Sequence, residues 1–211
     1  FNPANIAAIT FTNKAAREMQ ERITHMLGEK PKGITISTFH SLGVRLLREE
    51  ATVLGYKPRF SIFDATDCQA IVADLSGSVD KATIRRLQSI ISNWKNGLVT
   101  PDAARHLASN ETEALAARVY LSYAATLKAY QAVDFDDLIV LPVELFSQHP
   151  AVLDKWQNKL RYLLVDEYQD TNACQYTLLK LLTGPRPAFT AAGDDDQAIS
   201  GSRGADIENL R

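Results

Sequence analysis

The sequence has no long hydrophobic run and no targeting segment. No apolar stretch approaches the roughly 18 residues that a membrane-spanning helix needs, and no basic leader opens the chain. These absences favour a cytoplasmic protein that does not associate with membranes. The chain begins at Phe1 without an initiator Met, so we interpret it as a fragment of a longer protein.

Cysteine is scarce in this chain. Cys68 and Cys174 lie far apart and lack the close spacing of metal ligands. A disulfide between them would suit a secreted protein, but two reduced, buried thiols are the favoured interpretation for a cytosolic one.

A strong charge of one sign is also absent, because 23 Lys and Arg residues face 25 Asp and Glu residues. The balance excludes a global basic field that would attract nucleic acid. The charges are unevenly distributed, since residues 1–60 hold nine basic and five acidic side chains. This basic segment could meet a phosphate backbone, although a solvated helix face explains the same charges.

The glycine-rich phosphate loop, G-x-x-x-x-G-K-[ST], is missing as well. The nearest spacing runs from Gly28 to Gly33, but Ile34 and Thr35 follow where Lys and Ser or Thr are required. Either that loop lies upstream of Phe1, or the protein is not a nucleotide enzyme.

Alternating strand and helix patterns at both ends of the chain predict a parallel α/β sheet. The expected strands are continuous apolar or β-branched runs at residues 6–11, 33–38, 162–165 and 189–192. The expected helices have capping residues and helical apolar spacing, at residues 14–27, 41–54 and 173–182.

The middle of the chain differs, because it has helical periodicity but no convincing strand. Helices are expected at residues 65–75, 81–96, 101–109 and 111–131. We therefore predict a helical insertion at residues 64–132 that interrupts a sheet domain made of residues 1–63 and 133–211.

Two carboxylates end one of the predicted strands. The apolar run Leu163–Val165 stops at Asp166 and Glu167, and functional groups of parallel sheets gather at the carboxyl ends of the strands. One carboxylate can hold Mg²⁺ while the other polarises a water molecule. For an isolated pair, helix capping explains the residues equally well.

Five short segments carry most of the remaining information. They are Thr10–Ala16, Thr38–Ser41, Asp134–Ile139, Val165–Asn172 and Gly193–Gln197. In this order they closely resemble the first half of superfamily 1 DNA helicases of the Rep/UvrD/PcrA type. The resemblance covers nearly the whole chain.

The resemblance implies an incomplete RecA-like P-loop motor domain, called 1A, with an inserted all-helical subdomain, called 1B. It implies the N-terminal motor portion of an ATP-dependent 3′-to-5′ DNA helicase, which translocates on single-stranded DNA and unwinds duplex DNA in replication or repair. ATP and Mg²⁺ would be the cofactors, and single-stranded and forked DNA the partners. Without its phosphate loop, we expect this chain to be inactive alone.

For the nucleotide site, the resemblance assigns Asp166 to Mg²⁺, through a water molecule. Glu167 would activate the water that attacks the terminal phosphate of ATP. Gln197 would sense that phosphate, and Arg203 would couple the nucleotide to DNA. Acidic residues such as Asp194–Asp196 are more often loop charges than metal ligands.

For DNA, the resemblance assigns two loops. The contacting residues would be Phe11, Thr12, Asn13 and Lys14 in the first loop and Thr38, Phe39 and His40 in the second. From the residues alone, Phe11 would be a core residue and His40 a structural hydrogen bonder. For Asp136 and Asp137, which belong to another family motif, we expect a structural or coupling role.

The chain departs from the family pattern after Gln197. Ser200 and Ser202 stand where the family carries aromatic side chains. A serine cannot stack on a base, so this DNA platform should be absent. Two alternatives stay open: a degenerate, non-catalytic module that binds DNA or protein, and a subunit of a helicase–nuclease.

Overall fold

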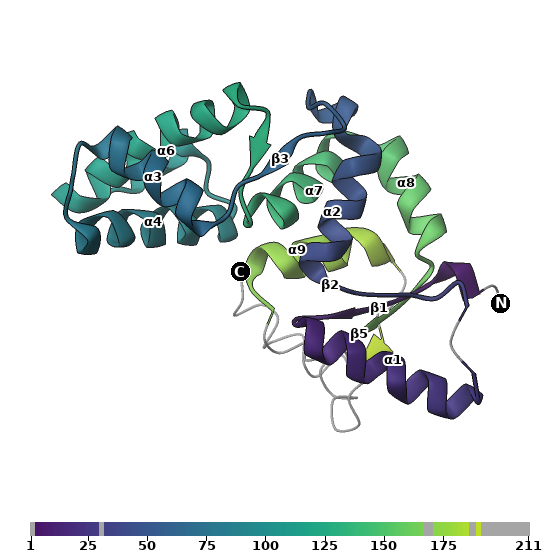
Figure 1. Cartoon of the computed structure of the whole chain (residues 1–211). Helices are drawn as coiled ribbons and strands as arrows, with labels where there is room; N and C mark the ends of the chain where they lie inside the picture. The colour runs from purple at the N-terminus through teal and green to yellow at the C-terminus, as the bar shows by residue number, and fades with distance from the viewer. Residues whose placement is uncertain (1–2, 30–31, 167–170, 186–188, 191–211) are drawn as a thin grey trace. The chain divides into compact units, whose positions relative to one another are not determined.

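The computed structural model describes residues 3–29, 32–166, 171–185 and 189–190 (Figure 1). The chain divides into two compact units. Unit 1 comprises Phe1–Leu46 and Pro142–Arg211, and unit 2 comprises Leu47–Leu141.

Unit 1 contains a four-stranded parallel sheet. Its strands are β1 (Ile6–Thr10), β2 (Thr35–Thr38), β5 (Tyr162–Val165) and β6 (Phe189–Thr190), in the spatial order β2-β1-β5-β6. In the register, Ile9 of β1 lies opposite Ser37 of β2 and Val165 of β5. The predicted α/β class with a parallel sheet is therefore confirmed.

Strand β1 lies at the centre of the sheet, and all five of its residues are buried. Ala7 and Ala8 have no exposed surface, and their small side chains let helices approach both faces closely. Figure 1 shows α1 (Asn13–Leu27) on one side of the sheet and α9 (Ala173–Thr183) on the other. The chain therefore runs β1-α1-β2 as a parallel βαβ unit.

Further helices complete unit 1. A short 3-10 helix, η1 (Pro3–Asn5), precedes β1, and α8 (Pro150–Lys159) precedes β5. Gln157 of α8 donates a hydrogen bond from Nε2 to the carbonyl of Leu181 in α9, at 2.8 Å. Trp156, also on α8, is fully buried. Two helices cross the unit boundary along the chain, α2 (Phe39–Glu50) and α7 (Asp137–Gln148).

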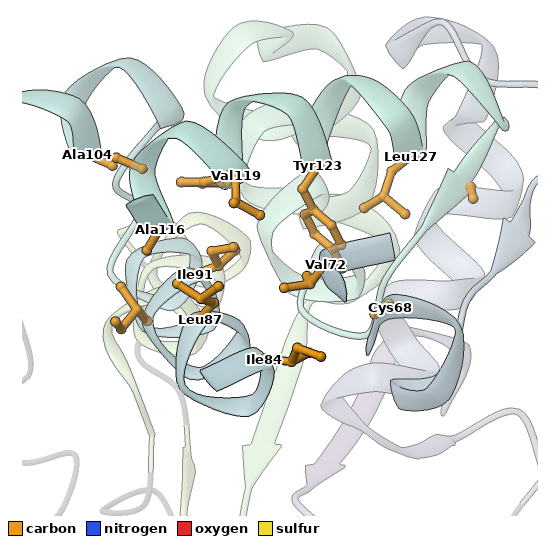
Figure 2. Close-up of a cluster of buried hydrophobic side chains, with 14 residues drawn as sticks. Cys68, Val72, Ile84, Leu87, Ile91, Ala104, Ala116, Val119, Tyr123 and Leu127 are labelled. Atoms are coloured by element: carbon orange, nitrogen blue, oxygen red, sulfur yellow. The ribbon is translucent and has the colours of Figure 1, made fainter. Parts of the chain in front are cut away.

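Unit 2 is mainly helical. Its helices are η2 (Ala51–Leu54), α3 (Ala65–Ser76), α4 (Lys81–Asn96), α5 (Pro101–Leu107) and α6 (Glu111–Ala129). Two short strands, β3 (Ser61–Ile62) and β4 (Ala132–Val133), pair in parallel. Figure 2 shows the core between the helices, which includes Cys68, Val72, Leu87, Ile91, Val119, Tyr123 and Leu127.

Local capping explains where these helices begin. Asp80 precedes α4 and accepts a hydrogen bond from the backbone N–H of Thr83, and Thr100 before Pro101 does the same for Ala103. Asp64 forms a reciprocal capping box with Asp67 at the start of α3. Because such caps use neighbouring residues, the expected helices at 65–75 and 81–96 agree with the observed ones to within one residue.

The structure also contains elements that the sequence did not predict. Helices α7 and α8 lie in a stretch that we left unassigned, and α7 contains Pro142, which lacks the N–H that a helix interior uses. The α7 sequence is apolar on most sides, so it shows no clear helical period. The proposed division at residues 64–132 stays a prediction, and the compact unit 2 is wider than that segment.

Candidate functional site

The carboxyl ends of three neighbouring strands meet at one edge of the unit 1 sheet. Because β1 pairs in parallel with both β2 and β5, the residues that follow these strands lie at the same edge. Phe11 follows β1, Phe39 follows β2 and Asp166 follows β5. The sheet therefore brings together three of the segments singled out in the sequence.

Phe11 and Phe39 form an aromatic pair at this edge. Their ring centroids are 5.1 Å apart, with the planes tilted by 53°. Phe39 is 1% exposed, whereas Phe11 is half-buried and keeps part of its ring accessible. The buried ring thus supports the accessible one from the core side.

Thr10 and Thr12 shape the loop that carries Phe11. The hydroxyl of Thr10, at the end of β1, is fully buried and donates to the carbonyl of Thr12 at 3.1 Å. The Thr12 hydroxyl accepts a hydrogen bond from the backbone N–H of Ala15 at 3.0 Å, and so caps α1. Asn13 and Lys14 follow as exposed residues in the first turn of α1.

Strand β2 leads into α2 in a similar way. The Thr38 hydroxyl accepts from the backbone N–H of Ser41 at 3.0 Å and donates to the Ser41 hydroxyl at 3.0 Å. Phe39 and His40 begin α2, and His40 is half-buried. Two helix N-termini therefore follow adjacent strands, and such termini favour anions through their free N–H groups and their dipoles.

Asp166 lies next to the central strand. Its backbone N–H donates to the carbonyl of Ile9 at 3.0 Å, and the residue is 9% exposed. A carboxylate is the hard oxygen ligand that Mg²⁺ prefers, and Mg²⁺ usually keeps several waters rather than a full protein shell. Within the described residues no group of three or more His, Cys, Asp or Glu could hold a metal.

Several predicted site residues lie outside the described residues. They are Glu167, Asp194, Asp195, Asp196, Gln197, Ser200, Ser202 and Arg203. Their proposed roles stay predictions.

A second polar cluster, in unit 2, was not predicted as a cluster. The Lys95 ammonium is buried and lies 2.8 Å from Oδ2 of Asp134 and 2.7 Å from Oδ1 of Asp137. The Tyr123 hydroxyl donates to Oδ2 of Asp134 at 2.8 Å. The signal was present in the sequence, because Lys95 falls on the same helical stripe as Leu87 and Ile91, which face the core.

Burial and charge shift the pKa values of this cluster. Burial raises the pKa of Asp137 to about 7, although Lys95 opposes the shift. Burial would also raise the pKa of Asp134, but attraction to Lys95 and hydrogen bonds hold it below the usual range. Burial would lower the pKa of Lys95, but attraction to the two carboxylates is stronger than this effect and raises that pKa. Lys95 therefore stays charged among carboxylates of unequal acidity.

Asp134 and Asp137 also cap α7. The backbone N–H of Asp137 donates to Oδ1 of Asp134 at 2.8 Å, and the backbone N–H of Asp134 donates to Oδ2 of Asp137 at 3.0 Å. The neighbouring Asp136 accepts from Nδ2 of Asn96 at 3.0 Å. Asp134 and Asp137 thus stabilise the start of α7, and Asp136 contacts the last residue of α4.

The two cysteines agree with the expectation of reduced, buried thiols. Cys68 and Cys174 are buried and form no disulfide. No helix within the described ranges is long and apolar enough to cross a membrane.

The parallel sheet places this chain in the class of α/β proteins. Proteins of this class bind ligands at the carboxyl ends of their strands, where the polar residues of this sheet lie. The comparison with known families is more specific, because the model described as "UvrD/REP helicase N-terminal domain" matches residues 1–211. The chain belongs to this family.

Relatives with curated names support the same assignment. ATP-dependent DNA helicase Rep of Escherichia coli (strain K12) is 50% identical to this chain, in an alignment that covers 100% of the chain and 32% of the relative. ATP-dependent DNA helicase PcrA of Staphylococcus epidermidis is 45% identical, covering 99% of the chain and 29% of the relative. The chain therefore spans about a third of the length of these curated relatives.

Proposed function

We propose that this chain is the N-terminal motor portion of an ATP-dependent DNA helicase that moves 3′-to-5′ along single-stranded DNA and unwinds duplex or forked DNA. Replication or repair in the cytoplasm is the expected setting. One observation carries the proposal: the loops after β1 and β2 and the carboxylate after β5 share one edge of the sheet. A DNA contact and a nucleotide site can be coupled there over a short distance.

The two loops would form the DNA contact. Phe11, with an accessible ring, would stack on a base, which contributes roughly 1–3 kcal/mol per base. Phe39 would act through Phe11, since its own ring is buried beneath it. Thr12, Asn13, Lys14 and His40 would hold the phosphate backbone, helped by the two helix N-termini. Thr38, which is buried and bonded to Ser41, would shape the second loop.

The strand end after β5 would serve the nucleotide. Asp166 would hold Mg²⁺ through water, and the ion would neutralise charge on the phosphates of ATP. Glu167 would orient and deprotonate the attacking water, Gln197 would sense the terminal phosphate and Arg203 would relay its state to the DNA loops. The position of Asp166 beside β1 supports this assignment, because β1 leads directly into the Phe11 loop.

The phosphate loop is absent from these 211 residues, so we expect the chain alone to hydrolyse no ATP. The tests of nucleotide hydrolysis therefore use the intact protein. DNA-stimulated ATP turnover by the isolated chain would contradict this expectation.

Two alternative functions keep some support. Ser200 and Ser202, in place of aromatic residues, favour a non-catalytic module that binds DNA or protein. A helicase–nuclease subunit would carry the same motor motifs. A nuclease domain elsewhere in the intact protein would distinguish it.

The decisive experiment replaces the proposed base in the intact protein. Glu167→Gln keeps the shape of the side chain but removes its basicity, so ATP should still bind while hydrolysis falls by at least about a hundredfold. Nucleotide binding and phosphate release should be measured separately. If turnover persists in Glu167→Gln, Glu167 is not the base; if the unaltered protein shows no turnover either, the non-catalytic alternative is favoured.

A further inference from the structure

Unit 2 contains a cavity of about 420 Å³ whose lining includes none of the residues proposed to contact DNA or the nucleotide. Its walls come from the start of α3, the middle of α4, the middle of α6 and the loop before α7. All of its lining residues lie within unit 2, so the cavity is complete in this unit. Its volume falls in the range of ordinary ligand pockets, roughly 300–1,000 Å³.

The inner wall of the cavity is apolar. Val72 and Ile91 are 1% and 3% exposed and belong to the hydrophobic core of the unit (Figure 2). Phe63 is half-buried, and the Cys68 thiol has its pKa raised, mainly by burial, so it stays neutral. An apolar group of a ligand would therefore meet a dry, uncharged surface.

The charged side chains that line the cavity have one sign, beside the neutral polar residues Gln88, Ser92 and Tyr123. Asp64, Asp134 and Asp136 line it, and among the described residues that line it there is no Lys, Arg or His. The negative charge of Asp134 is compensated by the Lys95 ammonium, which lies 2.9 Å from Oδ1 and 2.8 Å from Oδ2 of Asp134. The remaining negative charge therefore belongs to Asp64 and Asp136.

Neither Asp64 nor Asp136 is buried, so both can meet a ligand without a large desolvation cost. Asp64 accepts from the backbone N–H of Asp67 at 2.8 Å, and Asp136 accepts from Asn96 at 3.0 Å. A carboxylate has about four lone-pair sites, so each retains the capacity to accept a hydrogen bond from a ligand.

We propose that this cavity binds a small organic cation, with an aromatic or branched aliphatic body in the apolar pocket and a primary ammonium or amidinium group beside Asp64 and Asp136. The body accounts for the apolar inner wall, and the cationic head accounts for the charged side chains of the lining, which are all acidic among the described residues. An anionic ligand of the same shape would be repelled, and a neutral one would leave the negative charge of the two carboxylates uncompensated.

Occupancy of the cavity would also act on the start of α7. Asp134 and Asp136 immediately precede Asp137, where α7 begins, and both line the cavity. A cation bound between Asp64 and Asp136 would join the start of α3 to the start of α7. Ligand binding should therefore raise the thermal stability of unit 2.

The test uses three probes of one shape: 4-phenylbutylamine, 4-phenylbutanol and 4-phenylbutyrate. Methyl resonances of Val72 and Ile91 in the whole chain report binding by nuclear magnetic resonance. The amine should shift these resonances and bind about tenfold more tightly than the alcohol, since hydrogen bonds to charged groups are the stronger ones. The carboxylate probe should bind least.

Two variants locate the site. Ala65→Trp places a bulky side chain at an exposed position of the lining and should abolish the methyl shifts. Asp136→Asn removes one charge and should reduce the preference for the amine while binding of the alcohol is retained. Val79→Ala, at a residue that is 96% exposed and outside the lining, is the control and should bind as the unaltered chain does.

Three outcomes would overturn the proposal. They are no shift with any probe, equal affinity for the three probes, and methyl shifts that survive Ala65→Trp together with an unchanged preference for the amine in Asp136→Asn. If Ala65→Trp does not fold, the comparison of amine and alcohol in Asp136→Asn decides the matter alone. The result has no bearing on the helicase proposal, because the cavity shares no residue with the sheet edge.

Discussion

The Lys95 ammonium, near the end of α4, lies 2.7 Å from Oδ1 of Asp137, the first residue of α7. Both side chains are almost completely buried, at 7% and 11% exposure. A buried charge without a partner is costly, so each residue depends on the other. The ion pair ties the last turn of one helix of unit 2 to the start of another element far along the chain.

Lys95→Met should destabilise unit 2 by roughly 3–5 kcal/mol, because it leaves the buried carboxylates without their counter-ion. Urea unfolding followed by circular dichroism measures the change. Lys81→Met, at an exposed position on the same helix, is the matched control and should change stability by no more than about 0.5 kcal/mol. Equal effects of the two substitutions would contradict the role given to Lys95.

The stability of unit 2 should fall as the pH rises between about 4 and about 7. Burial raises the pKa of Asp137 from 3.8 to about 7, so in this window the folded state binds a proton that the unfolded state has released. The lowered pKa of Asp134 affects the stability of unit 2 only below this pH window, and the raised pKa of Lys95 affects it only above the window.

Asp137→Asn tests this dependence, because the amide does not titrate. Urea midpoints measured across the window should decline in the unaltered chain and change less in the variant. A flat profile in the unaltered chain, or the same decline in both, would show that Asp137 is ionised throughout.

Phe11→Ala should weaken binding of single-stranded DNA by roughly 1–3 kcal/mol, the usual contribution of one stacked base. Fluorescence anisotropy with a labelled oligonucleotide, at fixed salt, measures the affinity. Phe11→Trp should retain binding, because indole also stacks. Met26→Ala, at an 81% exposed position at the far end of α1, is the control. Unchanged affinity in Phe11→Ala would mean that Phe11 is only a core residue.

Ser200→Tyr combined with Ser202→Trp should tighten single-strand binding in the intact protein, because aromatic faces replace hydroxyls that cannot stack. The same anisotropy assay applies. Ser200→Ala with Ser202→Ala serves as the control and should leave the affinity near that of the unaltered protein. If the aromatic pair brings no gain, these positions do not face DNA.

Much of the local structure was predictable because its causes are local. Thr12, Asp80 and Asn110 each cap a helix by accepting from a backbone N–H three residues ahead. The helices expected from residues 14, 81 and 111 begin within one residue of those positions. The ends were less predictable. The helix expected at 41–54 changes to a 3-10 helix at Ala51, and the one expected at 111–131 ends at Ala129.

The candidate site was predicted as separate segments rather than as an arrangement. The Asp166 and Phe11 segments were noticed because polar or aromatic groups follow apolar strands. That Phe39 is buried under Phe11 depends on packing between residues from two strand ends, and the loop sequences contain no sign of which ring is covered. The role of Lys95 was not predicted, because a single cation on an apolar helix face gives no sign of the distant residues, Asp134 and Asp137, that pair with it.

By itself, the sequence determined the α/β class, the family and the starts of helices such as α3, α4 and α6, because capping, periodicity and motif order are properties of neighbouring residues. The tertiary structure decided the strand order β2-β1-β5-β6, the pairing of Lys95 with Asp134 across 39 residues and the cavity beside that pair. These features depend on contacts between distant segments. Such contacts form only when the free energy gained by burying the whole core offsets the conformational entropy that is lost in bringing those segments together.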